Sequence, residues 1–318
     1  MNNSQTRALA GAFVLVFGAG LLAFGLQPYG VYLLSLWAVY TIGATGLNLT
    51  LGYAGQVSLA QATFVGIGAY TTAILLPHGV PFGITLLVGA ALCFGLGVLL
   101  GFPALRVQGH YLAFVTLALC TIAFLVFRNE AWLTGGIYGI NHIRRPAPFT
   151  GAVGYLWLCL GVLALVTFGT WWLLRSPWGR AFVALRENPV RAASLGVEVR
   201  TYTLLAFAIG AALGGVSGSL YASLVQYIEP TPFALTLSFS LLLMVVVGGS
   251  GSFLGPYLGA LVAVLLPEWL RFLHDYYLVI YGMLVILLLV LCPEGLVGLA
   301  GRVVRRLRPA APAAEPAP

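Results

Sequence analysis

Long uncharged apolar runs dominate this chain and limit what it can fold into more than any other feature. Of its 318 residues, 60% are hydrophobic and only 7% are charged, whereas soluble globular domains carry about a quarter charged residues. So few charges cannot cover a surface that faces water, so the surface is expected to face lipid. The sequence therefore predicts an all-α membrane protein that crosses the bilayer several times.

Ten apolar runs are long enough to span a bilayer, allowing for tilt and breaks. They lie near 8–26, 30–50, 57–76, 82–102, 110–127, 151–174, 201–224, 233–249, 254–272 and 277–293. The run at 57–76 is the least regular, since a broken or re-entrant helix would give a similar pattern. We expect one transmembrane domain over residues 1–308 and a disordered Pro/Ala-rich tail over 309–318.

The arginines predict how this bundle is oriented. All fifteen basic residues are arginine, because the chain contains no lysine. If the N-terminus is cytoplasmic, eleven arginines fall at inner ends and loops, and four fall outside, at Arg128, Arg144, Arg145 and Arg271. This split follows the positive-inside rule, so both termini are predicted to be cytoplasmic.

The missing lysine also excludes some chemistry. A Walker A loop needs a lysine on the β- and γ-phosphates, so the chain is not expected to hydrolyse ATP. Its cysteines lie inside apolar runs, and its histidines stand singly without a partner at metal-ligand spacing. No metal or other cofactor is therefore expected in the chain itself.

An uncharged but polar segment, LGYAGQVSLAQATFVGIGAY at 51–70, interrupts the apolar pattern. Unsatisfied polar groups are costly in lipid, so these side chains face either protein or a water-filled cavity. One interpretation is contact between helices. The other is a substrate pathway, with a helix break near Gly55, Gln56 capping or orienting that break, and Gln61 and Ser58 on the pathway wall. The pathway candidates are Asn48, Gln56, Ser58, Gln61, Thr63 and Tyr70.

Glycines mark two candidate helix breaks or gates. Gly52 and Gly55 belong to the polar segment, whereas Gly248, Gly249 and Gly251 belong to a second glycine-rich stretch that runs to Gly259. The second stretch is a candidate counterpart of the first, across the pathway or at a cytoplasmic gate.

The predicted cytoplasmic loop at about 175–200 has its own pattern. Trp178, Phe182 and Leu185 recur at helical spacing, and Pro189 favours a break after Asn188. A second short helix is expected from Val190 to Leu195, with Gly196 just after its end. Such a pair of helices either lies on the membrane surface or docks a cytoplasmic partner. The docking candidates are Arg180, Arg186, Glu187, Asn188, Arg191, Ala192, Ala193 and Gly196.

This loop resembles the coupling loop of ABC importer permeases, although Arg191 stands where that pattern has a glutamate. In order along the chain, TGLNLTLGYAGQVSLAQATFVGIGAY, GHYLAFVTLAL, LTGGIYGI, SPWGRAFVALRENPVRAASLG, VVVGGSGSFLGPYLGA and PEGLVG resemble the permeases of branched-chain amino-acid ABC transporters. The element YLAFVTLA points to the LivM-type subunit.

The resemblance implies an importer in the bacterial inner membrane. Its partners would be a LivH-type permease subunit, two ATPase subunits that bind ATP and Mg, and a periplasmic substrate-binding protein. Trp132 and Thr134–Gly136 on the outer loop are candidates to meet that binding protein, and Trp132 is equally suited to anchoring in the membrane interface.

Other functions remain open at this point. Relatives in this family carry urea or short amides. A stand-alone secondary transporter or channel is the alternative from a different class, but proton-coupled carriers usually need an ionisable residue deep in the membrane. Every acidic residue here lies near the end of a predicted span or in a loop.

Overall fold

The computed structural model describes residues 3–23, 25–104 and 110–270, together with residues 280, 282–283, 286, 295–299 and 302. Regular structure in this part is helical, apart from an isolated bridge between Ile140 and Ile228. The long helices are α1 (Asn3–Leu22), α2 (Pro28–Leu47), α3 (Gln61–Leu75), α4 (Phe82–Ala104), α5 (His110–Asn129), α7 (Ala152–Arg175), α10 (Val199–Val225), α11 (Leu235–Gly248) and α12 (Gly255–Leu270). Short helices α6 (Ala131–Thr134), α8 (Pro177–Glu187) and α9 (Pro189–Ser194) connect them.

Helix α10 forms the centre of the bundle and packs against α2, α3 and α4. Small residues let the helices approach closely, as is usual between membrane helices. A Cβ on Gly218 of α10 would overlap the Val65 carbonyl of α3. Hydroxyls then link the helices, since Ser217 Oγ donates to Val39 O at 2.8 Å and Ser219 Oγ donates to Gly68 O at 3.2 Å.

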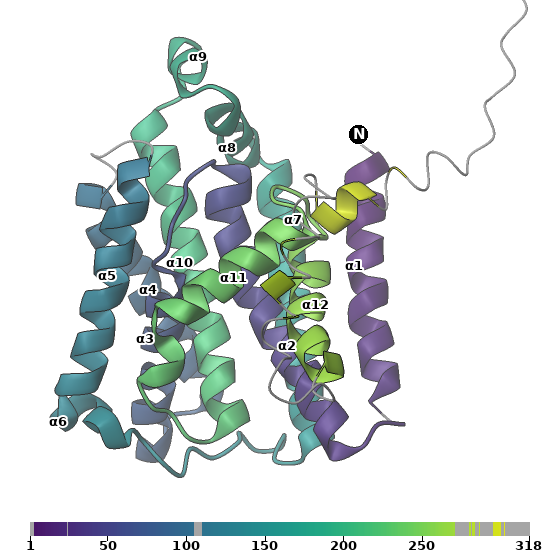
Figure 1. The fold of residues 1–318 in the computed structure, drawn as a ribbon, viewed down its shortest axis with the longest axis vertical. Coiled ribbons are helices and arrows are strands. Elements are labelled where there is room, and N and C mark those ends of the chain that lie inside the picture. Colours follow the sequence, from purple (N-terminus) through teal and green to yellow (C-terminus); the bar gives the residue numbers. More distant parts are fainter. Residues whose placement is uncertain are drawn as a thin grey trace, which may run out of the picture.

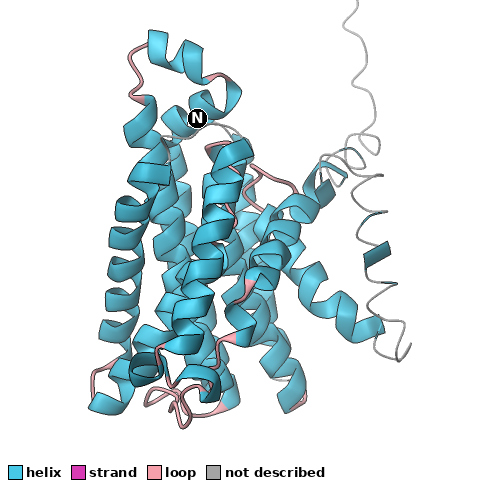
Figure 2. Ribbon diagram, turned by 60° about the vertical axis from the view of Figure 1, so that its left-hand side comes forward, coloured by secondary structure: helices cyan, strands magenta, loops and turns pink. Residues whose placement is uncertain are grey.

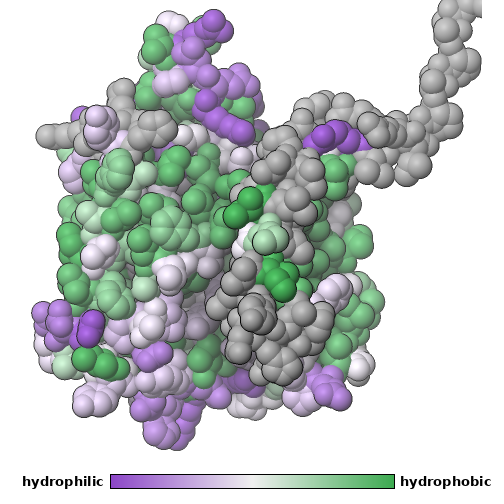
Figure 3. Space-filling model, viewed as in Figure 1, coloured by the Kyte–Doolittle hydropathy of each residue, from purple (hydrophilic) through white to green (hydrophobic). Residues whose placement is uncertain are grey.

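Five of the described helices are long and apolar enough to cross a membrane. They run over Pro28–Tyr53, Phe82–Pro103, Tyr111–Asn129, Ala152–Arg175 and Val199–Val225. Hydrophobic residues fill the middle of the face in Figure 3, and hydrophilic residues gather at its two ends. The fold is therefore the predicted all-α polytopic bundle.

Each of the first nine predicted spans coincides with one of the long helices. The tenth, at 277–293, lies largely outside the described residues, and so does the tail at 309–318. The approximate bounds differ most at two helices, since α1 covers Asn3–Leu22 and not 8–26, and α3 begins at Gln61 and not near 57.

Three helices are shorter than a full membrane crossing. α3 has 15 residues, α11 has 14 and α12 has 16, so each is about 21–24 Å long, against a hydrocarbon core of about 30 Å. α11 runs obliquely across the bundle (Figure 1), and most loops gather at the two ends (Figure 2). Irregular backbone inside such a bundle is tolerated only where protein or water satisfies it.

Candidate translocation and coupling site

The predicted break lies directly after α2. This helix continues as a wide π-helical turn, Asn48–Tyr53, which ends at Ala54. Gly55 then takes a positive φ of 72°, which glycine adopts without strain. Residues 56–60 are irregular before α3 begins at Gln61. We refer to residues 48–60 as the α2–α3 break.

Side chains from other helices satisfy the backbone of this break. Thr116 Oγ1 of α5 accepts from Leu59 N at 3.0 Å, and Ser238 Oγ of α11 accepts from Ala62 N at 3.0 Å. The first N–H groups of a helix need such partners. Gln56 does not supply one, because its side chain makes no hydrogen bond and lies five residues before α3. Of the two predicted roles for Gln56, capping the new helix was therefore wrong, and orienting the break stays a prediction.

Asn48 ties the break to the α11–α12 loop, residues 249–254. Its Nδ2 donates to Ser252 O at 2.9 Å, and its Oδ1 accepts from Gly251 N at 2.9 Å. One buried amide thus makes two hydrogen bonds to a segment about two hundred residues away. The two predicted glycine-rich segments lie side by side.

Glycines make this contact possible. A Cβ on Gly52 would overlap both Asn48 Oδ1 and Gly251 N. Gly251 has a φ of 74°, and a Cβ there would overlap the Arg186 guanidinium and lie 2.7 Å from Gly52 O. Gly248 ends α11 and Gly249 follows with a φ of 118°. The candidate gate glycines thus form one junction, and Arg186 lies against it.

Helix α8 rests on the same junction. Phe182 is fully buried and packs with Leu49 and Ala54 of the break. A Cβ on Gly55 would lie 3.2 Å from Arg186 Cα. The candidate coupling loop and the candidate gate are therefore in direct contact, which their separation in the sequence does not reveal.

The loop itself forms the two predicted helices, α8 and α9. Ser176 caps α8 by accepting from Trp178 N, and Asn188 caps α9 by accepting from Arg191 N. Gly196 follows α9 with a φ of 84°. The expected stripe is only partly correct, because Leu185 is buried beside Phe182 whereas Trp178 is 46% exposed.

Helix α9 projects beyond the bundle at the end shown uppermost in Figure 1. Val190 is 78% exposed and Leu195 is 83% exposed. Ala192 is buried, whereas the other predicted docking residues are exposed or partly exposed. These are Arg180, Arg186, Glu187, Asn188, Arg191, Ala193 and Gly196.

The six pathway candidates are all buried, with at most 8% of each residue exposed. They differ in whether their polar atoms have partners. Gln61 Nε2 donates to Gly43 O and Gly210 O, each at 3.1 Å, and so joins α3 to α2 and α10. Ser58 Oγ accepts from Ala60 N at 3.3 Å. Gln61 thus makes the interhelical contacts of the first interpretation, whereas Asn48 bonds to the α11–α12 loop.

Gln56, Thr63 and Tyr70 form a second group. The Gln56 amide and the Tyr70 hydroxyl are buried and have no hydrogen-bond partner among the described residues, whereas the buried Thr63 hydroxyl has the weakly bonding Cys120 thiol beside it. The Tyr70 ring packs on Phe127 and Phe233, with centroid distances of 4.9 and 5.9 Å. Buried polar groups are rarely left unpaired without a reason, so these three pathway candidates differ from Asn48, Ser58 and Gln61, whose polar atoms make hydrogen bonds within the protein.

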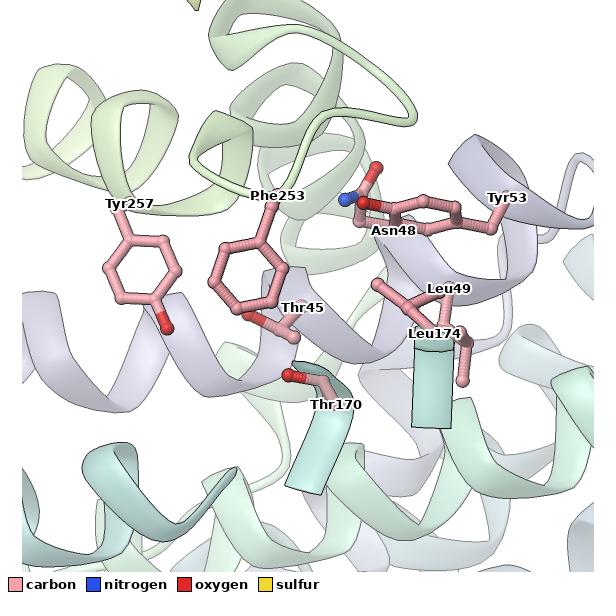
Figure 4. A pocket seen from close by; sticks show the side chains of 8 residues that line it. All are labelled: Thr45, Asn48, Leu49, Tyr53, Thr170, Leu174, Phe253 and Tyr257. Atoms are coloured by element: carbon pink, nitrogen blue, oxygen red, sulfur yellow. The ribbon is translucent and has the colours of Figure 1, made fainter. Parts of the chain in front are cut away.

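A small cavity of about 10 Å³ adjoins the junction. Side chains reach it from α2, the break, α7, the α11–α12 loop and α12 (Figure 4). They are Thr45, Asn48, Leu49, Tyr53, Thr170, Leu174, Phe253 and Tyr257. This volume holds about one water molecule and is far too small for an amino acid.

At the opposite end of the bundle, hydrogen bonds of Thr134 hold the loop that follows α5. Thr134 Oγ1 donates to Phe127 O at 2.7 Å and accepts from Gly136 N at 3.2 Å. Thr134 is therefore buried and structural, whereas Trp132 and Tyr138 are exposed. Trp132 Nε1 donates to Glu130 Oε2 at 2.7 Å.

Sequence reasoning missed Thr116, Ser238 and Ser252, which hold the break and its neighbouring loop. Single hydroxyl residues in apolar helices are common, and many only bond to their own helix, as Thr41 does to Trp37 O. A signal that separates the two cases is absent from a single sequence.

The described residues form a bundle of spanning and broken helices, with a loop of two short helices resting on one break. Residues 29–289 match the family described as "Branched-chain amino acid transport system / permease component". The chain belongs to this family, as its motifs predicted.

Similar proteins agree with this assignment. The chain is 34% identical over 292 residues to the high-affinity branched-chain amino acid transport system permease protein LivM of Escherichia coli K12, which covers 82% of this chain and 68% of that one. It is 26% identical over 326 residues to a probable LivM of Methanocaldococcus jannaschii, covering 84% and 93%. An autoinducer 2 import permease LsrC of Enterobacter sp. 638 is 27% identical over 231 residues, covering 67% and 66%. No solved structure matches the chain significantly.

The predicted identity as a multi-pass transport component of this family is thereby confirmed. That the chain itself hydrolyses no ATP stays a prediction from its missing lysine.

Proposed function

We propose that this chain is the LivM-type permease subunit of an ABC importer in the bacterial inner membrane. It receives branched-chain or other apolar amino acids from a periplasmic binding protein and passes them inward. A second, LivH-type permease subunit completes the pathway, and two partner ATPases bind ATP and Mg. Family membership and the named relatives support this proposal.

The observation that carries the coupling part is the position of α8 and α9. One side of this pair packs on the α2–α3 break through Phe182, and the other side projects from the bundle with Val190 and Leu195 exposed. Exposed apolar residues beside arginines suit a partner groove with apolar walls and carboxylates at its rim. A cytoplasmic ATPase bound there would touch an element that already contacts the candidate gate.

The arginine distribution supports a topology with both termini and this loop in the cytoplasm. A cysteine placed at residue 188 should react with an impermeant thiol reagent only from the cytoplasmic side, and one at residue 140 only from outside. Reversed labelling would overturn this topology.

For the pathway, we propose Gln56, Thr63 and Tyr70 as the wall residues, because their polar groups have no partner stronger than a thiol among the described residues. Such groups can make weak hydrogen bonds to a passing amino acid or its hydration water. Asn48, Ser58 and Gln61 instead hold the wall in place through the bonds described above.

The test is ATP-driven uptake. The chain is co-expressed with its second permease subunit, ATPases and binding protein and reconstituted in vesicles, and uptake of labelled leucine is measured with and without ATP. Leucine uptake that needs ATP is expected. Uptake without ATP would instead identify a secondary transporter, and uptake of urea but not leucine would identify the short-amide alternative.

The coupling surface has its own variant. Replacing Val190 and Leu195 by glutamate should abolish co-purification of the ATPase, because both exposed side chains would lie in the interface. Ile137→Glu, which changes an apolar residue that is 63% exposed at the other end, is the control and should retain the ATPase. Normal co-purification in the double variant would contradict the proposed docking surface.

A further inference from the structure

A large surface groove lies at the end of the bundle opposite α8 and α9. Its volume is about 710 Å³. The turn between α3 and α4, the start of α4 and the first half of α7 form its walls, and residues 144–149 form its end. The walls are apolar and include Leu86, Leu87, Leu158 and Val162. Leu87 is 67% exposed.

The groove runs along one end of α4 and α7. α7 packs on α1 and α2, and α4 packs on α3 and α10, so the two walls belong to different helix pairs of the bundle. The α7 wall residues Leu158 and Val162 are four residues apart, which is about 6 Å along the helix. The groove therefore lies within about the first three turns of α7, and its volume comes from its width between the two helices.

Two adjacent arginines stand at the end of the groove. Arg144 is exposed, and Arg145 is partly buried with its Cζ 5.4 Å from the centroid of the Tyr155 ring. Arg145 Nη1 lies 3.5 Å from Thr150 O, at the limit of a hydrogen bond, and its Nε is buried without a partner. No carboxylate in the described part of the chain forms an ion pair with either arginine.

Neither arginine has an anionic partner among the described residues, although Arg145 also lies over the Tyr155 ring. The proposed topology puts them outside, where the positive-inside rule disfavours basic residues. A positive pair at the mouth of an apolar groove matches a molecule with an anionic phosphate and a long acyl chain. A soluble protein partner would not explain the apolar walls.

We propose that this groove is a binding site for one anionic glycerophospholipid of the outer leaflet. Its phosphate lies between Arg144 and Arg145, and one acyl chain lies along α7 toward Val162. This inference concerns a different end of the molecule from the coupling surface and does not depend on the transported substrate.

The experiment measures retained lipid on the full-length chain by native mass spectrometry. The purified protein is incubated with equal amounts of dioleoyl phosphatidylglycerol and dioleoyl phosphatidylcholine. Two arginines near a headgroup should favour the anionic lipid by roughly 30-fold, since each contributes about fivefold. The Arg144→Gln/Arg145→Gln variant should lose this preference. Arg128→Gln, an exposed arginine on the same side and outside the groove, should keep it.

A second variant tests the acyl chain separately. Gly83 lines the groove, and a Cβ there would meet nothing within 4 Å, so Gly83→Phe fills the groove without backbone strain. It should reduce retention of both lipids while leaving the melting temperature unchanged. Inorganic phosphate at millimolar concentration should not displace the lipid, because it lacks the acyl chain.

Three results would overturn the proposal. They are equal retention of the two lipids by the unmodified protein, unchanged preference in the double arginine variant, and displacement of the lipid by phosphate alone. If the double arginine variant retains lipid normally but binds the periplasmic protein less well, the arginines serve that protein and the lipid site is refuted.

Discussion

Two glutamines in one segment provide a direct test of the division between wall-holding and wall-lining residues. Gln61 and Gln56 are both buried, but Gln61 makes two interhelical hydrogen bonds and Gln56 makes none. The same substitution, glutamine to leucine, removes an amide of similar size from each site. Opposite effects on stability and transport are therefore expected.

The loss of stability expected for Gln61→Leu follows from the two hydrogen-bond partners of Gln61. Gly43 O and Gly210 O lie inside α2 and α10, where helix carbonyls also accept from their own helix. Neither oxygen is orphaned by the change, so only the bonds themselves are lost. Hydrogen bonds between membrane helices contribute about 0.6 kcal/mol each on average and at most about 1.7. The loss should be about 1–2 kcal/mol.

A loss of this size is measurable as a melting temperature. With an unfolding entropy of about 2.1 cal/mol/K per residue, a chain of 318 residues shifts its melting temperature by about 1.5 °C per kcal/mol, so Gln61→Leu should lower the melting temperature of the detergent-purified protein by about 1.5–3 °C. Transport per folded complex should change little. Gln56→Leu removes an unpaired buried amide, whose burial costs about 1–3 kcal/mol, so its melting temperature should stay or rise while leucine uptake falls.

The assay pairs thermal unfolding with leucine uptake in reconstituted vesicles for both variants. A Gln61→Leu protein with unchanged melting temperature and reduced uptake would return Gln61 to the pathway wall. A Gln56→Leu protein that melts as early as Gln61→Leu would mean that the Gln56 amide has a stabilising partner. Either outcome refutes the division proposed above.

Other predictions concern the junction. Replacing Arg186 and Arg191 by glutamate should lower substrate-stimulated ATP hydrolysis, because charge reversal in a docked interface costs several kcal/mol; normal hydrolysis would leave the loop as a membrane-surface element. Gly251→Ala should impair transport more than Gly196→Ala, since both glycines have a positive φ but only a Cβ on Gly251 would overlap Arg186; equal effects would indicate backbone strain alone. Asn48→Ala should speed hydrogen exchange at the Gly251 amide about tenfold or more, as it removes the acceptor of a bond near 1–1.5 kcal/mol, and unchanged exchange would mean that the loop is held otherwise.

Features set by local backbone chemistry were predictable from the sequence. Pro189 and Gly196 delimit α9 as expected, because one disfavours continuing the preceding helix and the other accepts a positive φ. The break at Gly55 follows from the same freedom of glycine. The restart of α3 at Gln61 was not predictable, because its capping hydroxyl comes from Ser238, far along the chain.

The direction in which buried polar side chains point could not be predicted from the sequence either. A buried glutamine in a membrane protein must face protein or water, but the sequence does not say which. Gln61 faces protein because carbonyl oxygens of α2 and α10 lie 3.1 Å from its Nε2. The outcome for Trp178 depends on how α8 is rotated on the bundle, which Phe182 decides by packing against Leu49 and Ala54.

The position of α8 suits it to transmit a movement of a bound partner to the junction of the two glycine-rich segments. Phe182 packs on the break, and Arg186 lies against both Gly55 and Gly251, which belong to segments about two hundred residues apart. Asn48 joins those same two segments by hydrogen bonds. A shift of α8 by a bound partner would therefore displace both sides of the junction together, without passing along the length of a helix. Since Phe182 supplies the packing and Arg186 the contact with both glycines, the charge-reversal variant should weaken this transmission while α8 remains seated on the bundle.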